Sequence, residues 1–335
     1  MRCGVVSGMS RRIRIANLLR TLNNDYQCLQ RDACRDAAKR HRLALTELSA
    51  RNDAEQQLQQ IKDCLAEPEA IRPRALLVHP VAEVSLRAVA EQAARLGVAF
   101  VLLNRWCAYV EELRGRYPRI PIFCVVPDQC AIGRIQGQQF KKLLPDGGEL
   151  LYITGAFYTS SAQLRLAAVM SELAETDIEM VIKNGDWSVA SGTWAAQDWL
   201  QKACAPAASG CAVGAQNDRM AVGARAALVS AAIELQRPGL LDIPVAGCDG
   251  TVAEGQACVR TGELCATVVM PSTADAAVDR LVCAWDSGEI PPAEISMEVR
   301  SFPDLSLVAR PAPGTTEPRL GTSRPRATVA TRGSN

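Results

Sequence analysis

The sequence of 335 residues has few aromatic side chains, two histidines and almost no net charge. Lys and Arg number 37 and Asp and Glu 36, so the chain lacks the positive excess of a nucleic-acid coat or a polybasic membrane anchor. No window approaches the roughly 18 uninterrupted apolar residues that a membrane-spanning helix needs. We therefore expect neither a nucleic-acid partner nor a membrane span.

The motifs of several enzyme classes are also missing. The chain has no Walker A loop, no GxGxxG after a predicted strand and no GxSxG elbow. Ser160 and Ser161 lie in a predicted loop with no evident base beside them. Because only His41 and His79 are available and no two cysteines form a CxxC pair, a zinc site is not expected. The sequence thus predicts no catalytic residue, no metal site and no cofactor.

The 13 cysteines form an odd set, so they cannot all pair within one chain. Scattered cysteines in a chain of this length favour free thiols in a reducing compartment over a stapled secreted scaffold. The first residues, Met1 to Arg12, show no recognisable export signal, because Gly, Ser and Arg interrupt the apolar stretch. Both observations favour a cytoplasmic location.

From Ile13 onward, short apolar runs alternate with amphipathic segments. One such segment places Leu86, Val89, Ala90 and Ala93 on one helical face before Gly97 ends it. Apolar runs separated by such helices are typical of parallel strands covered on both faces. Strands are expected at Ile13–Leu19, Leu43–Leu48, Ala75–Val78, Val98–Leu103, Ile120–Val126, Glu149–Ile153, Ile178–Asn184, Ala212–Ala215, Pro244–Gly247 and Cys265–Val269. Roughly ten strands exceed one compact doubly wound unit, so two α/β lobes are predicted.

Polar and aromatic side chains follow many of these predicted strands. In open parallel sheets, ligands bind outside the carboxyl ends of the strands, where these residues would gather. Amides, carboxylates, one arginine and aromatic rings suit a polyol or sugar, whose hydroxyls bind planar polar groups and whose apolar face rests on a ring. At any single position an Asn or Asp can equally be a helix N-cap or a turn residue. Caps, however, do not require Tyr26, Arg105 and Trp187 as well.

Several segments, in the same order along the chain, resemble type I periplasmic binding proteins for sugars. Residues 215–224 (AQNDRMAVGA) resemble their AQND-MA-GA segment, and residues 245–251 (VAGCDGT) their V-G-DGT strand end. Residues 21–26 (TLNNDY) are similar to the TLNNPFF entry of ribose-binding proteins, and residues 102–105 (LLNR) to their LDR. The ligand domain of lactose-repressor-type regulators has the same fold. The resemblance therefore leaves transport and regulation open.

The resemblance implies an α/β fold of two doubly wound parallel-sheet lobes joined by a three-crossover hinge that closes on one sugar. We expect one lobe at 12–126 plus 270–295, the other at 127–269 plus 296–310, and a disordered tail at 311–335. The implied ligand-binding positions are Asn24, Tyr26, His79, Asn104, Arg105, Gln163, Trp187, Asn217, Asp249 and Met270. Arg105 would fork two hydroxyls, Asp249 and Asn217 would bind hydroxyls, and Tyr26 and Trp187 would sandwich the ring. Arg165 is interpreted as a supporting or salt-bridging residue.

This sequence departs from the family at four of these positions. Asn104 occupies a position where the family often has Asp, and His79 replaces a usual Asn. Gln163 occupies the position of a binding Arg and Met270 that of a Gln. Two charged contacts thereby become neutral, which favours a neutral monosaccharide or polyol and leaves the particular sugar open. The first hypothesis is a periplasmic binding protein that delivers its ligand to an ABC transporter permease. The alternatives are a cytoplasmic sugar-sensing module that acts through a partner, and a degenerate product that folds but binds poorly.

Overall fold

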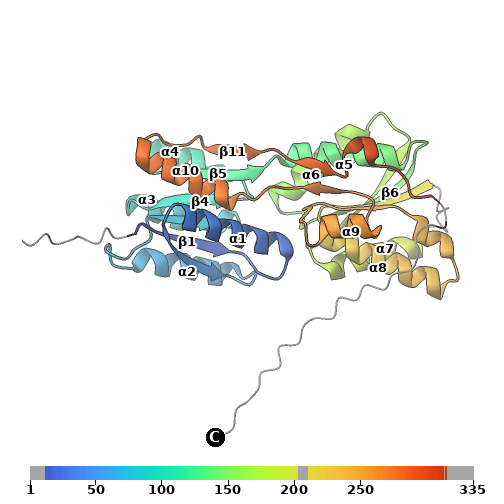
Figure 1. Ribbon diagram of the computed structural model, residues 1–335, viewed down its shortest axis with the longest axis horizontal. Helices are drawn as coiled ribbons and strands as arrows, with labels where there is room; N and C mark the ends of the chain where they lie inside the picture. The colour runs from blue at the N-terminus through green and yellow to red at the C-terminus, as the bar shows by residue number, and fades with distance from the viewer. Residues whose placement is uncertain (1–11, 203–209, 313, 315–335) are drawn as a thin grey trace, which may run out of the picture.

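The computed structural model describes residues 12–202, 210–312 and 314. Most of the tail expected at 311–335 and the segment Met1 to Arg11 lie outside these residues, so neither prediction is tested. The described chain forms two α/β bodies side by side, each built on its own sheet (Figure 1). The expected fold class, two parallel sheets covered by helices, is confirmed. None of the described helices is long and apolar enough to cross a membrane.

The first sheet contains six parallel strands. In spatial order they are β11 (Glu294–Met297), β5 (Ile122–Pro127), β4 (Ala99–Leu103), β3 (Ala75–Val78), β1 (Arg14–Leu19) and β2 (Ala44–Ser49). The faces are covered by α1 (Asp25–Arg40) and α10 (Ala274–Ser287) on one side, and by α2 (Ala54–Ala66), α3 (Arg87–Arg95) and α4 (Tyr109–Arg116) on the other. The chain order reverses between β1 and β3, which makes their carboxyl ends a switch point.

The second sheet is smaller and also parallel. Its order is β7 (Ile178–Asn184), β6 (Gly148–Thr154), β8 (Cys211–Ala215) and β9 (Val245–Ala246). Its faces are covered by α5 (Gln129–Leu143) and α6 (Ser160–Leu173) on one side, and by α7 (Val189–Lys202) and α8 (Asp218–Glu234) on the other. Its switch point lies between β6 and β8, so each sheet has one crevice where loops diverge.

The chain passes between the two bodies three times. The passages follow β5, precede α10 and connect β11 to β12 (Arg300–Phe302), which pairs antiparallel with β10 (Thr267–Val269). The remaining described elements are α9 (Gly255–Thr261) and three short 3-10 turns at Val84–Leu86, Pro238–Asp242 and Leu305–Leu307. Strands β11 and β12 and helix α4 were not expected. The two strands are three or four residues long, pair on one side only and carry no continuous apolar run.

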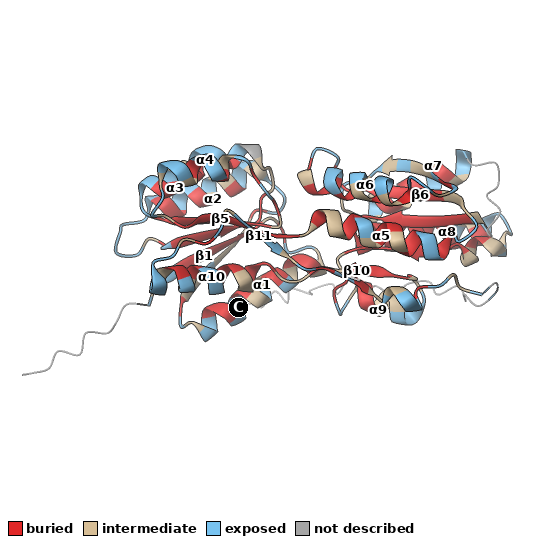
Figure 2. Cartoon of the chain, turned by 90° about the horizontal axis from the view of Figure 1, so that it is seen from above, coloured by how far each residue is buried: buried red, intermediate tan, exposed pale blue. Residues whose placement is uncertain are grey.

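Burial follows the layers. Figure 2 shows the central strands of both bodies buried and the helices buried mainly on the sides that face them, whereas the edge strands β2, β7 and β11 are more exposed. Each sheet has one apolar cluster on each face, and a fifth cluster joins the bodies through Tyr26, Ile132, Cys248, Val268 and Met270. The eleven cysteines among the described residues are all free thiols, six of them buried. Burial raises the pKa of Cys34 and Cys124 to about 12, so these thiols stay protonated.

Helices α7 and α8 approach closely because of small residues at their contact. A Cβ on Gly192 would lie 2.1 Å from the Met220 carbonyl oxygen, which is backbone and cannot move aside. Gly192→Ala should therefore lower the free energy of unfolding by about 2 kcal/mol, the typical cost of overpacking. The matched control is Gly115→Ala in α4, where a Cβ meets nothing within 4 Å. There the better helix propensity of Ala should raise the free energy of unfolding by up to about 1 kcal/mol. Chemical denaturation measures both, and shifts of the same sign would contradict this account of the packing.

Candidate functional site

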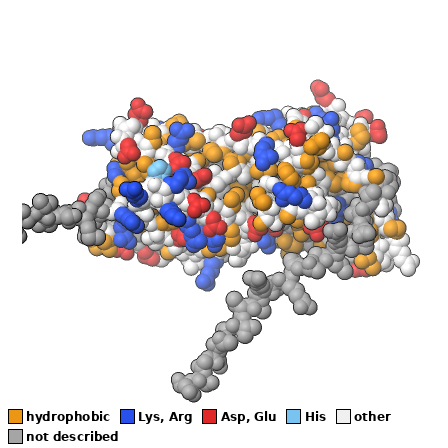
Figure 3. All heavy atoms as spheres, in the orientation of Figure 1, with side chains coloured by type: hydrophobic (Ala, Val, Ile, Leu, Met, Phe, Trp, Pro, Cys, Tyr) orange, Lys and Arg blue, Asp and Glu red, His pale blue; other side chains and the backbone are white. Residues whose placement is uncertain are grey.

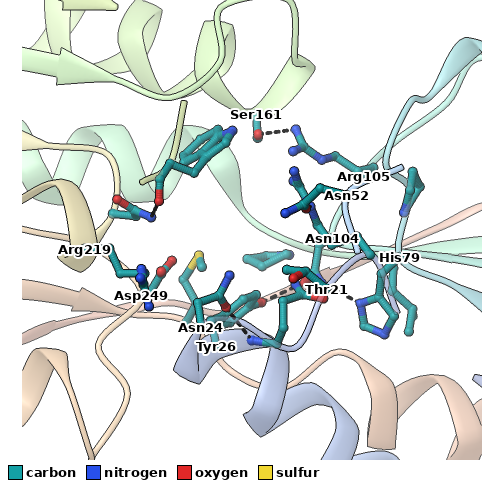
Figure 4. A pocket seen from close by; sticks show the side chains of 18 of the residues that line it. Thr21, Asn24, Tyr26, Asn52, His79, Asn104, Arg105, Ser161, Arg219 and Asp249 are labelled. Carbon is teal, nitrogen blue, oxygen red and sulfur yellow. Dashed lines mark hydrogen bonds between the residues drawn. The ribbon is translucent and has the colours of Figure 1, made fainter. Parts of the chain in front are cut away.

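A cavity of about 330 Å³ lies where the crevices of the two sheets face each other. Nine of the ten residues expected to bind a ligand line it: Asn24, Tyr26, His79, Asn104, Arg105, Trp187, Asn217, Asp249 and Met270. Figure 4 shows side chains from both bodies converging on this space. The topology explains the convergence, since each of these residues follows a strand or begins the helix after it.

Gln163 lies outside the cavity. Its side chain is exposed, and its amide donates to the Phe157 carbonyl in the loop before α6. The geometry of α6 explains the difference: Ser161 and Arg165, four residues or about one turn apart, share the helix face that lines the cavity, and Gln163 falls between them on another face. The arginine interpreted as a supporting residue therefore occupies the place expected for Gln163.

Arg165 is buried, with 4% of its surface exposed, and its donors reach three other segments. The guanidinium donates to Gln129 Oε1 at 2.7 Å, to the Gln216 carbonyl at 2.6 Å and to Met270 Sδ at 3.2 Å. No carboxylate among the described residues forms an ion pair with it. Arg165 thus has a supporting role and also contributes positive charge to the cavity wall.

Tyr26, Asn104 and His79 form a chain of hydrogen bonds. The Tyr26 hydroxyl donates to Asn104 Oδ1 at 2.7 Å, and the Asn104 amide donates to His79 Nδ1 at 3.3 Å (Figure 4). Burial lowers the pKa of His79 to about 3, so the ring is neutral. Its Nδ1 accepts, which leaves the hydrogen on Nε2, a buried atom without a partner in the described chain. Through these two hydrogen bonds Asn104 positions the rings of Tyr26 and His79. Its own backbone is in the left-handed region, with φ at +65°.

Two of the expected ligand-binding amides are also helix N-caps. Asn24 accepts from the Gln27 N–H at 2.8 Å and begins α1, and Asn217 accepts from the Met220 N–H at 2.9 Å and begins α8. Asn217 uses its remaining amide to donate to the Trp187 carbonyl at 3.0 Å. Its function in the cavity wall is therefore to hold Trp187 in place, whereas the Asn24 amide has no partner among the described residues.

Trp187 is held in an unusual conformation. Its φ is +74°, which costs free energy for a large side chain, and its ring lies against Gly155, where a Cβ would collide with it. The guanidinium carbons of Arg165 and Arg105 lie 5.8 Å and 6.0 Å from the indole centroid, within range of cation–π attraction. The indole is therefore positioned by charge and by close contact with the backbone.

Asp249 contributes a carboxyl group to the cavity wall. Its backbone is strained, with φ at +113°, and the loop around it is fixed by Asp218, which accepts from the Gly250 N–H and the Thr267 hydroxyl, each at 2.7 Å. Burial raises the pKa of Asp218 to about 7, and burial beside Asp218 raises the pKa of Asp249 well above its usual range. Burial thus disfavours the charged form of both carboxyl groups, and the charge of Asp218 further disfavours that of Asp249.

Contacts also cross directly between the two bodies at the cavity. Arg105, on the first body, donates to Ser161 of α6, and Glu83 lies 3.4 Å from Arg105 while it accepts from the Ser160 hydroxyl at 3.2 Å. On the opposite side, Arg219 donates to the Asn23 carbonyl at 2.8 Å. These contacts close two sides of the cavity, as the Arg105–Ser161 bond in Figure 4 illustrates.

Several further cavity residues were not expected from the sequence, among them Arg20, Thr21, Asn52 and Gln129. Arg20 and Thr21 directly follow β1, and Asn52 follows β2. Arg20 donates to Asn52 Oδ1 at 3.1 Å, so the two form one edge of the cavity. The position just after a strand is the sequence signal that these three residues share.

The Asp218 carboxyl makes stability depend on pH. Its pKa is higher in the folded protein than the usual 3.8, so the folded state binds more protons between about pH 4 and pH 7. The free energy of unfolding should therefore fall as the pH rises through this window, and Asp218→Asn should remove that part of the slope. Asp198→Asn is the control, because Lys183 and Lys202 lower the pKa of Asp198 and place its effect below this window. Denaturation at several pH values measures both, and equal slopes for Asp218→Asn and the wild type would contradict the assignment.

Comparison with known proteins agrees with this architecture. The family model described as a periplasmic binding protein domain matches residues 15–280. The ribose import binding protein of Salmonella typhimurium is 25% identical over 255 residues, which are 76% of this chain and 78% of the relative. A solute-binding protein of an ABC transporter from Actinobacillus succinogenes, solved with bound D-allose, superimposes with a TM-score of 0.75 at 19% identity over 89% of this chain and 99% of the other. A solute-binding protein of an ABC transporter from Bacillus halodurans, solved with bound myo-inositol, superimposes with a TM-score of 0.72 at 22% identity over 88% of this chain and 96% of the other.

Proposed function

Because the chain belongs to the periplasmic binding protein domain family, we propose that it binds a monosaccharide or polyol in the cavity between its two sheets. The observation that carries the proposal is the convergence of nine expected ligand-binding residues on one space of about 330 Å³. The relatives support the same class of ligand, since their names or bound molecules are ribose, D-allose and myo-inositol.

The free groups of the cavity indicate how such a ligand is held. Arg105 presents its remaining N–H donors, the Asn24 amide donates, and the oxygens of the Asp249 carboxyl group accept from hydroxyls that a sugar offers in pairs. Tyr26 and Trp187 supply the ring faces, and the neutral His79 supports Asn104 through the hydrogen bond at its Nδ1. The polar groups would bind neutral hydroxyls and the aromatic rings would contact the apolar face of the sugar, as expected for a neutral monosaccharide or polyol.

We infer that the two bodies act as lobes, 12–126 plus 270–295 and 127–269 plus 296–310, which close on the ligand about the three connecting segments. The bound sugar is then delivered to an ABC transporter permease, the partner that the family implies, and the protein works in the periplasm. The role of the cavity is binding without chemical conversion, as in a family of solute-binding proteins.

A thermal-shift screen of pentoses, hexoses and polyols tests the binding proposal. A ligand present at 100 times its Kd stabilises the folded state by about 2.7 kcal/mol, which raises the melting temperature measurably. If no member of the screen raises it, the protein does not bind this class of ligand. Arg105→Ala should abolish the shift, because it leaves buried ligand hydroxyls without a partner.

The two positions on α6 distinguish the structural assignment from the sequence-based one. Arg165→Ala should abolish ligand binding or raise its Kd at least about tenfold. The substitution removes a buried charge and leaves Gln129 and Met270 without their hydrogen-bond partner. Gln163→Ala should leave the shift unchanged, since Gln163 is exposed outside the cavity. Isothermal titration with the best sugar of the screen measures both. Equal loss in the two variants would overturn the placement of α6.

A further inference from the structure

Two arginine pairs lie together at the amino ends of β1 and β3, the opposite end of the first sheet from the cavity. Arg12 and Arg14 flank Ile13, and Arg72 and Arg74 flank Pro73. The strands run parallel with Ile15 beside Ala75, and one residue earlier the Arg74 N–H donates to the Arg14 carbonyl at 2.7 Å. The register therefore places the two Arg-x-Arg segments side by side.

The four arginines line a second cavity of about 370 Å³, together with Ile13 and Ile71. None of the four forms an ion pair with a carboxylate of the described residues, although most other arginines of the first body do. Arg74 lies over the Trp285 ring at 4.6 Å, and Arg72 donates to the Glu67 carbonyl at 3.1 Å. Like charges held next to each other in neighbouring strands destabilise a sheet unless an opposite charge neutralises them.

We propose that this arginine cluster is an anion site that binds a phosphate-bearing group. Guanidinium groups bind phosphate through paired, charge-assisted hydrogen bonds, and four of them match an anion with more than one charge. Ile13 and the exposed Ile71 add an apolar wall, which suits a phosphate attached to a small organic group. The same chemistry is presented by a free phosphate and by the headgroup of an anionic lipid.

The test compares wild type with Arg12→Gln/Arg72→Gln, which removes two charges but keeps Arg14 in its strand and Arg74 on Trp285. The control Arg119→Gln/Lys142→Gln removes the same charge from two exposed cations that have no ion-pair partner in the described chain. Inorganic phosphate is titrated at constant ionic strength, and sedimentation with phosphatidylcholine vesicles, with and without phosphatidylglycerol, measures lipid binding. The melting temperature without added anion is recorded for all three proteins.

At least one of the two probes should bind the wild type, and the double variant of the cluster should bind it about tenfold more weakly or worse while the control binds normally. Preference for phosphate identifies a free anion as the source, and preference for phosphatidylglycerol vesicles identifies a headgroup. Without added anion, the cluster variant should melt at a higher temperature than the wild type, because the repulsion is relieved. Equal binding by both variants, or no binding of either probe to the wild type, would overturn the proposal.

Discussion

The buried guanidinium of Arg165 organises the half of the cavity that the second sheet supplies. Its hydrogen bonds reach the start of α5, the end of β8 and the segment after β10, three parts of the chain that are far apart in sequence. A buried arginine requires its donors to be satisfied, so these segments are fixed relative to one another before any ligand enters. The position of Trp187 follows, since its indole lies within range of the same cation.

Much of the architecture could be predicted from the sequence because the parallel strands are buried on both faces. Such strands are continuous apolar runs, as in residues 75–78 and 99–103, and the ends of these runs mark the loops. Strands β11 and β12 lack this signal, because each pairs on one side only and its exposed residues alternate with more buried ones. Their placement depends on partners distant in sequence, which no local pattern encodes.

The site was predictable in its location but less so in the tasks of its residues. Strand ends gather at one edge of a sheet, so the set of residues was largely found. Asn24 and Asn217 both cap helices through the amide oxygen and both line the cavity, so the cap interpretation is confirmed and ligand binding by these amides stays a prediction. The choice between Gln163 and Arg165 depended on which face of α6 turns toward the cavity, because side chains two residues apart lie on different faces of a helix.

The contacts of Glu83, Arg105 and Arg219 across the cavity have a consequence for the conformational equilibrium. They are made between protein groups, so part of the free energy that favours the closed arrangement is intrinsic to the chain. The apparent affinity for any ligand scales with the fraction of molecules already in the competent state. Residues such as Glu83 that do not line the cavity can therefore set the concentration range in which the protein responds.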